Sequence, residues 1–238
     1  DRSVVWALSS RGRDRVALVA AHPPLGWERV VFAAPDVDVT GVVMSRVTGD
    51  PLIASAQPGY PRNEILDPAL RDHLKPLLDT QGGEPFGWEI VSMDDSEKRL
   101  IVSIYTSVQR SYYLVDRSNR GHVLLAESLA QDLAQALVPM RPVSIMSRDG
   151  TRLHGYLTLP RGVEPKRLPM VLLVHGGPWM RTGWGDPLRS EDAVHAQFFA
   201  NRGYAVLQVD FRGSYGYGHQ ILSAGMGEFA GKMHEDLL

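Results

Sequence analysis

Cysteine is absent from the 238 residues of this chain. Its absence excludes disulfide bonds, thiolate metal sites and a cysteine nucleophile, although it does not decide the compartment. No stretch approaches the roughly 18 apolar residues that a membrane helix needs. Basic residues are not in excess either, because 25 Lys and Arg stand against 27 Asp and Glu. We therefore expect a protein that binds neither nucleic acid nor a membrane, and as a separate expectation we place it in the cytoplasm.

The composition is that of an ordinary soluble globular protein, with 44% hydrophobic and 22% charged residues. The length allows one large domain or two smaller ones, each with its own core. Residues 1–3 resemble neither an initiator methionine nor a signal peptide, so we expect a missing or processed N-terminus.

The first part of the chain, to about Val138, has the pattern of short strands joined by turns. Strands are expected at 4–8, 15–19 and 28–32, with a break at 22–26, and again at 99–103, 112–115 and 122–125. Repeated small antiparallel sheets are typical of a β-propeller, although two weak copies also arise by chance in an all-β domain. Further strands are expected at 40–46 and 51–56.

One short helix is predicted within this first part, over residues 67–78. Asp67 suits the N-cap and Pro68 the first helical position, and we expect a break or a 3₁₀ turn at Pro76.

After Pro139 the pattern changes. Strands 142–147 and 153–159 flank a turn at Gly150, and 170–174 is an apolar run expected of a strand buried on both faces. A helix over 191–201, with Val194, Phe198 and Phe199 on its apolar side, precedes a second buried strand at 204–209. Strand, helix and strand in this order predict a parallel sheet. A last helix is expected over 227–238.

His175-Gly176-Gly177-Pro178 follows directly on the 170–174 strand. Paired glycines at the end of a parallel strand let backbone N–H groups point at a ligand, as the oxyanion loop of α/β-hydrolases does. Any strand can also end on a glycine turn. The aromatic stretch from Trp179 to Trp184 favours a shaped pocket wall, in which Trp179, Arg181 and Trp184 either contact substrate or pack.

Four motifs, in order and spacing, resemble the prolyl oligopeptidase family, in its acylaminoacyl-peptidase and dipeptidyl-peptidase branch. They are the hairpin from Arg148 to Pro160, the His175–Pro178 loop, residues 201–218, and Gly231 to Leu238. The resemblance implies a mixed fold. Residues 1–138 would be the last blades of a β-propeller, which is all-β, and 139–238 the N-terminal half of an α/β-hydrolase catalytic domain.

The resemblance also implies a serine peptidase that hydrolyses short peptides near the N-terminus, of acylaminoacyl or dipeptidyl type, through an acyl-enzyme and without cofactor or metal. The propeller would admit only short peptides. Gly177 would supply a backbone oxyanion donor, and Gly176 would allow the bend. The family's Gly-x-Ser-x-Gly elbow is not found in the chain, so the Ser, Asp and His are expected beyond Leu238.

Two residues of the chain imitate parts of that triad. Ser214 is an unsuitable nucleophile, because Arg212 stands where the first Gly of the elbow belongs. His175 is excluded as the base by chain order, and shaping the loop suits it better.

Other polar groups are expected to be structural. They are His154, His195, Arg202, Arg212, and the turn residues Asp36 and Asp38. His234-Glu235 begins a zinc-protease pattern, but Leu238 stands at the second His position.

Two alternatives remain open: a non-catalytic propeller scaffold with a vestigial hydrolase half, and an α/β-hydrolase esterase. On the peptidase interpretation the chain alone is inactive, and its partner is the rest of the catalytic domain, in a further segment, a second chain or a homo-oligomer. We then expect an uncovered sheet at 170–174 and 204–209, and an open side near residues 1–10.

Overall fold

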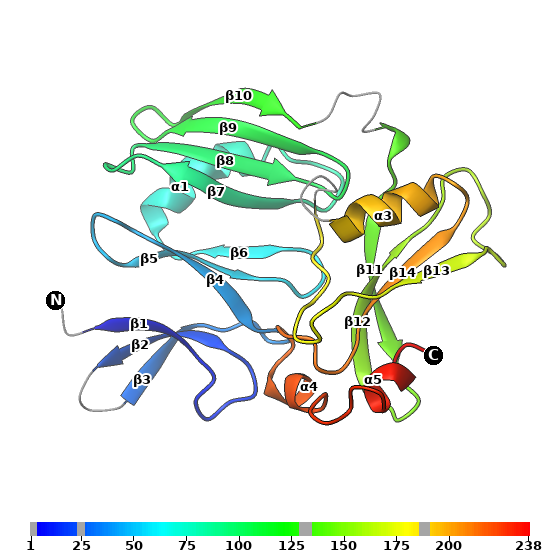
Figure 1. Cartoon of the computed structure of the whole chain (residues 1–238). Coiled ribbons are helices and arrows are strands. Elements are labelled where there is room, and N and C mark those ends of the chain that lie inside the picture. The colour runs from blue at the N-terminus through cyan, green and yellow to red at the C-terminus, as the bar shows by residue number, and fades with distance from the viewer. Residues whose placement is uncertain (1–3, 23–26, 129–134, 186–190) are drawn as a thin grey trace.

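The computed structural model of the chain describes residues 4–22, 27–128, 135–185 and 191–238. Three antiparallel sheets follow one another along the N-terminal part, and a fourth, mixed sheet forms the C-terminal part (Figure 1). Most of the regular structure is strand, with few helices. The predicted break at 22–26 falls largely on residues 23–26, outside the described ones.

The N-terminal sheets confirm the predicted strands. The first holds β1 (Val5–Ser9), β2 (Ala17–His22) and β3 (Trp27–Phe32), and the second β4 (Val39–Met44), β5 (Pro51–Ala56) and β6 (Arg62–Ile65). The third holds β7 (Gly87–Met93), β8 (Arg99–Tyr105), β9 (Arg110–Asp116) and β10 (Gly121–Glu127). Strand β1 is an edge of its sheet and exposes Val5 and Leu8, which is the open side expected near residues 1–10.

Helix α1 (Pro68–Leu78) begins as predicted, because the Asp67 carboxylate accepts the backbone N–H of Leu70. The predicted break at Pro76 is wrong, since the helix continues through it. Pro76 and Asp72, whose carbonyl loses its partner, both lie on the exposed side, where water can replace that hydrogen bond. The opposite face buries three leucines in the core between the second and third sheets.

The C-terminal sheet has the order β11-β12-β14-β13. Strands β11 (Met140–Met146) and β12 (Arg152–Thr158) form the predicted hairpin, and Gly150 takes a positive φ in its turn. Strands β13 (Met170–Leu173) and β14 (Ala205–Asp210) are parallel, and α3 (Glu191–Ala200) packs across them. The predicted strand–helix–strand unit is confirmed.

The apolar face predicted for α3 is wrong. The helix buries Ala193, Ala196 and Ala200 against the sheet, while Val194 and Phe198 are 45% and 48% exposed. Alanines spaced three and four residues apart share one helix face, and their size allows close packing. The larger side chains point outward.

Strand β13 is not buried on both faces, contrary to the prediction. It is an edge strand; Met170 and the adjoining Val174 are exposed, whereas β14, between β12 and β13, is mostly buried. The expected uncovered edge therefore lies on β13 and not on β14.

The helix predicted over 227–238 is also wrong in extent. Only α5 (Lys232–Glu235) forms there, and an unpredicted α4 (His219–Ser223) precedes it. Gly227 takes a positive φ in the turn between the two, where a continuous helix would end. None of the described helices is long and apolar enough to cross a membrane.

Candidate active site

The His175–Pro178 loop leaves the carboxyl end of β13 and turns along the surface. His175 is buried, whereas Gly176 and Gly177 are exposed. The loop lines a hollow of about 330 Å³, whose other walls are mostly apolar and include Phe211 and Phe229. The sequence placed this loop correctly at the end of a parallel strand.

Gly177 has the geometry of a free donor. Among the described residues its backbone N–H has no acceptor, and its φ of +129° is a conformation that side chains disfavour. An added Cβ would lie 2.7 Å from the Trp179 nitrogen. We expected Gly176 to allow the bend, but Gly176 has open space around it and no positive φ. The bend is therefore at Gly177.

His175 is fixed by several contacts. Its ring stacks on Phe211 at 4.6 Å, and its Nδ1 lies 2.8 Å from the Gly176 carbonyl oxygen. A carbonyl only accepts, so this contact places a proton on Nδ1. Nε2 lies 2.9 Å from Ser214 Oγ and 3.6 Å from Asp210 Oδ1. These contacts support the expected shaping role.

Ser214, His175 and Asp210 do not form a catalytic triad. In a triad the carboxylate holds one ring nitrogen and the serine meets the other. Here both Ser214 and Asp210 approach Nε2, and Ser214 is completely buried. A nucleophile with no exposed surface cannot reach a carbonyl, so the geometry supports the exclusion of Ser214.

Asp210, at the end of β14, anchors the segment that follows the loop. Its Oδ1 accepts the Thr182 backbone N–H at 2.7 Å, and its Oδ2 accepts the Tyr217 hydroxyl. Burial and the Asp210 charge raise the pKa of Tyr217, so the phenol stays protonated and donates. Asp210 thus contacts both flanks of the loop, at His175 and at Thr182.

The predicted binding residues separate in the structure. Trp179 is 60% exposed beside the loop. Trp184 is 6% exposed and packs edge-on against Tyr60, while its indole N–H donates to the Met140 carbonyl. Trp184 is therefore a packing residue of the junction between the two parts, and a place at a pocket mouth is wrong for it. Arg181 also reaches into that junction.

The residues expected to be structural have matching environments. Asp36 is exposed, and Asp38 accepts the N–H groups of Val16 and Gly218. His195 and His234 are exposed on helices. Within the described residues, no three His, Asp or Glu side chains gather as a metal site requires.

Arg212 and Asp236 form a buried ion pair, which Ser147 and the exposed Asp149 extend; we call these four residues the Arg212 cluster. Its guanidinium donates to Asp236 at 2.6 and 2.8 Å and to Asp149 at 2.9 Å. Those hydrogen bonds, Asp236 first, raise the pKa of Arg212. The cluster joins α5 to the β11–β12 turn, so the structural role expected for Arg212 is supported.

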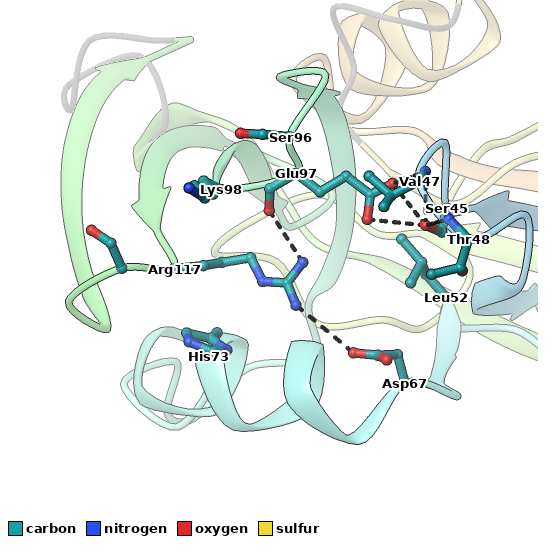
Figure 2. Close-up of a pocket in the computed structure, with 11 residues that line it drawn as sticks. Ser45, Val47, Thr48, Leu52, Asp67, His73, Ser96, Glu97, Lys98 and Arg117 are labelled. Carbon is teal, nitrogen blue, oxygen red and sulfur yellow. Dashed lines mark hydrogen bonds and ion pairs between the residues drawn. The ribbon is translucent and has the colours of Figure 1, made fainter.

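A second hollow, of about 440 Å³, lies between the second and third sheets, beside the N-terminal end of α1 (Figure 2). Its carboxylates are already engaged. Glu97 accepts from the Ser45 hydroxyl and the Arg46 N–H, and Asp67 caps α1 and faces Arg117 at 3.9 Å. Glu97 takes a φ of +56°. Both carboxylates already have donors from neighbouring segments, so we interpret this hollow as a joint between sheets.

Comparison with known proteins shows which proteins the chain is related to. No protein-family model matches it. It is 37% identical over 249 residues to dipeptidyl aminopeptidase BIII of Pseudoxanthomonas mexicana, an alignment that covers 100% of this chain and 34% of that protein. Its homologues and structural neighbours are dipeptidyl aminopeptidases and members of the prolyl oligopeptidase and acylaminoacyl peptidase family. It spans about a third of the length of the relatives that it matches.

Solved structures of prolyl oligopeptidase relatives agree in fold. A puromycin-hydrolyzing peptidase of Mycobacterium tuberculosis superposes with a TM-score of 0.69 at 18% identity, covering 100% of this chain and 36% of that one. An acylaminoacyl peptidase of Pyrococcus horikoshii gives 0.59 at 18% identity, covering 94% and 33%. At this identity the likeness concerns the fold alone.

Sequence reasoning missed Asp210 as a member of the site. Its position directly after a buried strand was an available signal, because the carboxyl ends of β13 and β14 meet at one edge of the sheet. The contact of Arg181 with the N-terminal part had no signal, since its partner Gln57 is 124 positions away.

Proposed function

We propose that this chain is the middle section of a serine peptidase that releases short units from the N-terminal end of peptides. The observation that carries the proposal is the backbone N–H of Gly177, an exposed residue in the loop after β13; this N–H has no acceptor among the described residues. An unpaired donor in that place suits a developing oxyanion. The relationship to a dipeptidyl aminopeptidase over the whole chain supports the same function.

The proposal divides the chain into two partial domains. Residues 1–138 are the last blades of a β-propeller that limits the size of the substrate, and 139–238 are the first half of an α/β-hydrolase domain. The exposed apolar edge of β13 supports this division. In the complete protein that edge pairs with the strand carrying the nucleophile, and the Ser, Asp and His lie beyond Leu238.

The proposed reaction is acyl transfer through two tetrahedral intermediates. The serine oxygen attacks the peptide carbonyl while the histidine takes its proton, and the negative oxygen accepts the Gly177 N–H. The C–N bond then breaks, and the histidine protonates the departing amine. Water repeats the sequence on the ester and releases the acid. Gly177 stabilises both intermediates, and the exposed Trp179 lies where it can contact the substrate.

Substrate preference is tested on the complete protein with matched chromogenic dipeptidyl, acylaminoacyl and simple ester substrates. We expect the dipeptidyl compound to be hydrolysed with the highest kcat/KM, as the name of the 37%-identical relative suggests. Preference for the acylaminoacyl compound would move the protein to that branch. Hydrolysis of the ester alone would favour an esterase, and no hydrolysis at all would favour a non-catalytic scaffold.

A further inference from the structure

Arg181, four positions after Gly177, extends from the C-terminal part to the N-terminal part. Its Nη2 donates to the Gln57 carbonyl, just after β5, at 3.0 Å and to the Tyr217 hydroxyl at 2.7 Å. The guanidinium also lies over the Tyr217 ring, 4.3 Å from its centroid. Arg181, three positions after the His175–Pro178 loop, is thus held by a backbone carbonyl of the N-terminal part.

The contacts continue from Tyr217 to the flanks of the loop. Tyr217 donates to Asp210, which accepts the Thr182 N–H at 2.7 Å and lies 3.6 Å from His175 Nε2. We call Gln57, Arg181, Tyr217 and Asp210 the Arg181 relay. It contacts the chain before Gly176 and after Gly177, and leaves the two glycines themselves free.

The Arg181 relay joins a buried negative charge, on Asp210, to a positive charge, on Arg181. The Asp210 side chain is completely buried, and a buried carboxylate needs compensating donors or a cation. Arg181 supplies positive charge across a single hydroxyl. Its Nε and Nη1 are buried without a hydrogen-bond partner among the described residues, so the guanidinium is held by the Gln57 carbonyl and by Tyr217, and not by a direct carboxylate. The residues around Gln57, just after β5, which we call the Gln57 turn, therefore supply one of the two contacts that fix the guanidinium.

We propose that Arg181 is a positioning residue for the Gly176–Gly177 loop, and that through it the Gln57 turn of the N-terminal part sets the position of the Gly177 N–H. This inference rests on the proposed function. It assigns the N-terminal part a role in placing the oxyanion donor, in addition to limiting substrate size. Arg181 acts through Tyr217 and Asp210 and contacts neither substrate nor reacting atoms.

Arg181→Met in the complete protein tests the inference, with Arg202→Met as the matched control. Arg202 also stacks on an aromatic ring, at 3.6 Å from the Phe198 centroid, and donates to one carbonyl, but its contacts are with Phe198 and not with a residue of the relay. A misplacement of about 1 Å can cost roughly 10² in rate, so we expect kcat to fall by about 10- to 100-fold in Arg181→Met. KM should stay within about threefold, since ground-state contacts are unchanged. Arg202→Met should match the wild type.

A second readout separates positioning from general damage. A dipeptide aldehyde forms a tetrahedral adduct that needs the oxyanion donor, whereas the product dipeptide does not. Affinity for the aldehyde should fall in the same ratio as kcat, while affinity for the dipeptide holds. Tyr217→Phe, which removes one oxygen atom, should reproduce the effect and serves if Arg181→Met does not fold.

Unchanged kcat, or a raised KM with kcat preserved, in folded Arg181→Met and Tyr217→Phe would overturn the inference. Equal loss of aldehyde and dipeptide affinity would also overturn it, because that marks a binding residue. Wild-type protein that neither hydrolyses peptides nor reacts with a serine-directed phosphonate would instead contradict the proposed function.

Discussion

The Arg212 cluster and the Arg181 relay are both built on an arginine of the C-terminal part, yet they differ in their acceptors. Arg212 is 4% exposed and donates to two carboxylates. Arg181 donates to a carbonyl and a phenol, and two of its nitrogens are unpartnered among the described residues. An arginine paired with carboxylates, like Arg212, is suited to stabilising the fold. An arginine with only neutral acceptors at the junction between the two parts, like Arg181, is suited to positioning a neighbouring loop.

Removing the Arg212 guanidinium should have the largest effect on stability. Arg212→Met leaves the Asp236 carboxylate, whose side chain is fully buried, without its cation. Losing one partner of a buried pair costs about 3–5 kcal/mol. Urea unfolding of the complete protein, followed by a probe in the C-terminal part, measures the loss. Arg202→Met, at an exposed position, should change the free energy of unfolding by less than about 1 kcal/mol, and equal losses would erase the proposed distinction.

Gly177 should show the reverse pattern, a large loss of rate with a small loss of stability. In Gly177→Ala the new Cβ meets the Trp179 nitrogen at 2.7 Å, so the loop must move and the donor with it. Loss of one oxyanion donor lowers kcat by roughly 10²–10³. Gly183→Ala, in open space on the same segment, is the control. Gly177→Pro, which removes the N–H itself, should be at least as inactive, and full activity in either folded Gly177 variant would refute the oxyanion role.

Acid should weaken the Arg212 cluster in a defined pH range. Burial opposes ionisation of Asp236, but the Arg212 hydrogen bonds prevail and lower its pKa below the ordinary 3.8. The unfolded chain therefore binds this proton first as the pH falls. Stability is fully present above about pH 5 and declines as the pH falls through 3.8 towards the folded value. Asp236→Asn should flatten this part of the stability curve, and an unchanged acid slope would show that other carboxylates cause it.

The smallest effect is expected from His154, whose ring stacks on Tyr217 at 4.3 Å beside the Arg181 relay. Burial, and next the Arg181 charge, lower the pKa of His154 below 6.5. The folded protein favours the neutral ring, so this contribution is present above pH 6.5 and declines as the pH falls through 6.5 towards the folded value. His154→Gln should remove a shallow slope between about pH 7 and pH 5 in thermal unfolding. If the stability of the variant fell more steeply with falling pH than that of the wild type, the predicted sign of the His154 contribution would be wrong.

The sequence predicted those features that depend on neighbouring residues. The Asp67 cap, the Gly150 turn and the loop after β13 follow from spacing and turn chemistry alone. The predictions failed for the buried face of α3 and for the burial of β13, because each depends on which other segments pack against that helix or strand. The Arg181 relay depends on contacts between distant segments. Such contacts leave no local pattern for a single sequence to show.

We propose that the chain carries an oxyanion loop but no nucleophile, and a labelling experiment tests this proposal. The complete protein and the 238-residue chain are treated with a serine-directed fluorophosphonate, digested, and examined by mass spectrometry. We expect one labelled serine, beyond Leu238, in the complete protein, and neither label nor peptidase activity in the 238-residue chain. A label on Ser214, or on any other serine from residue 1 to residue 238, would contradict it.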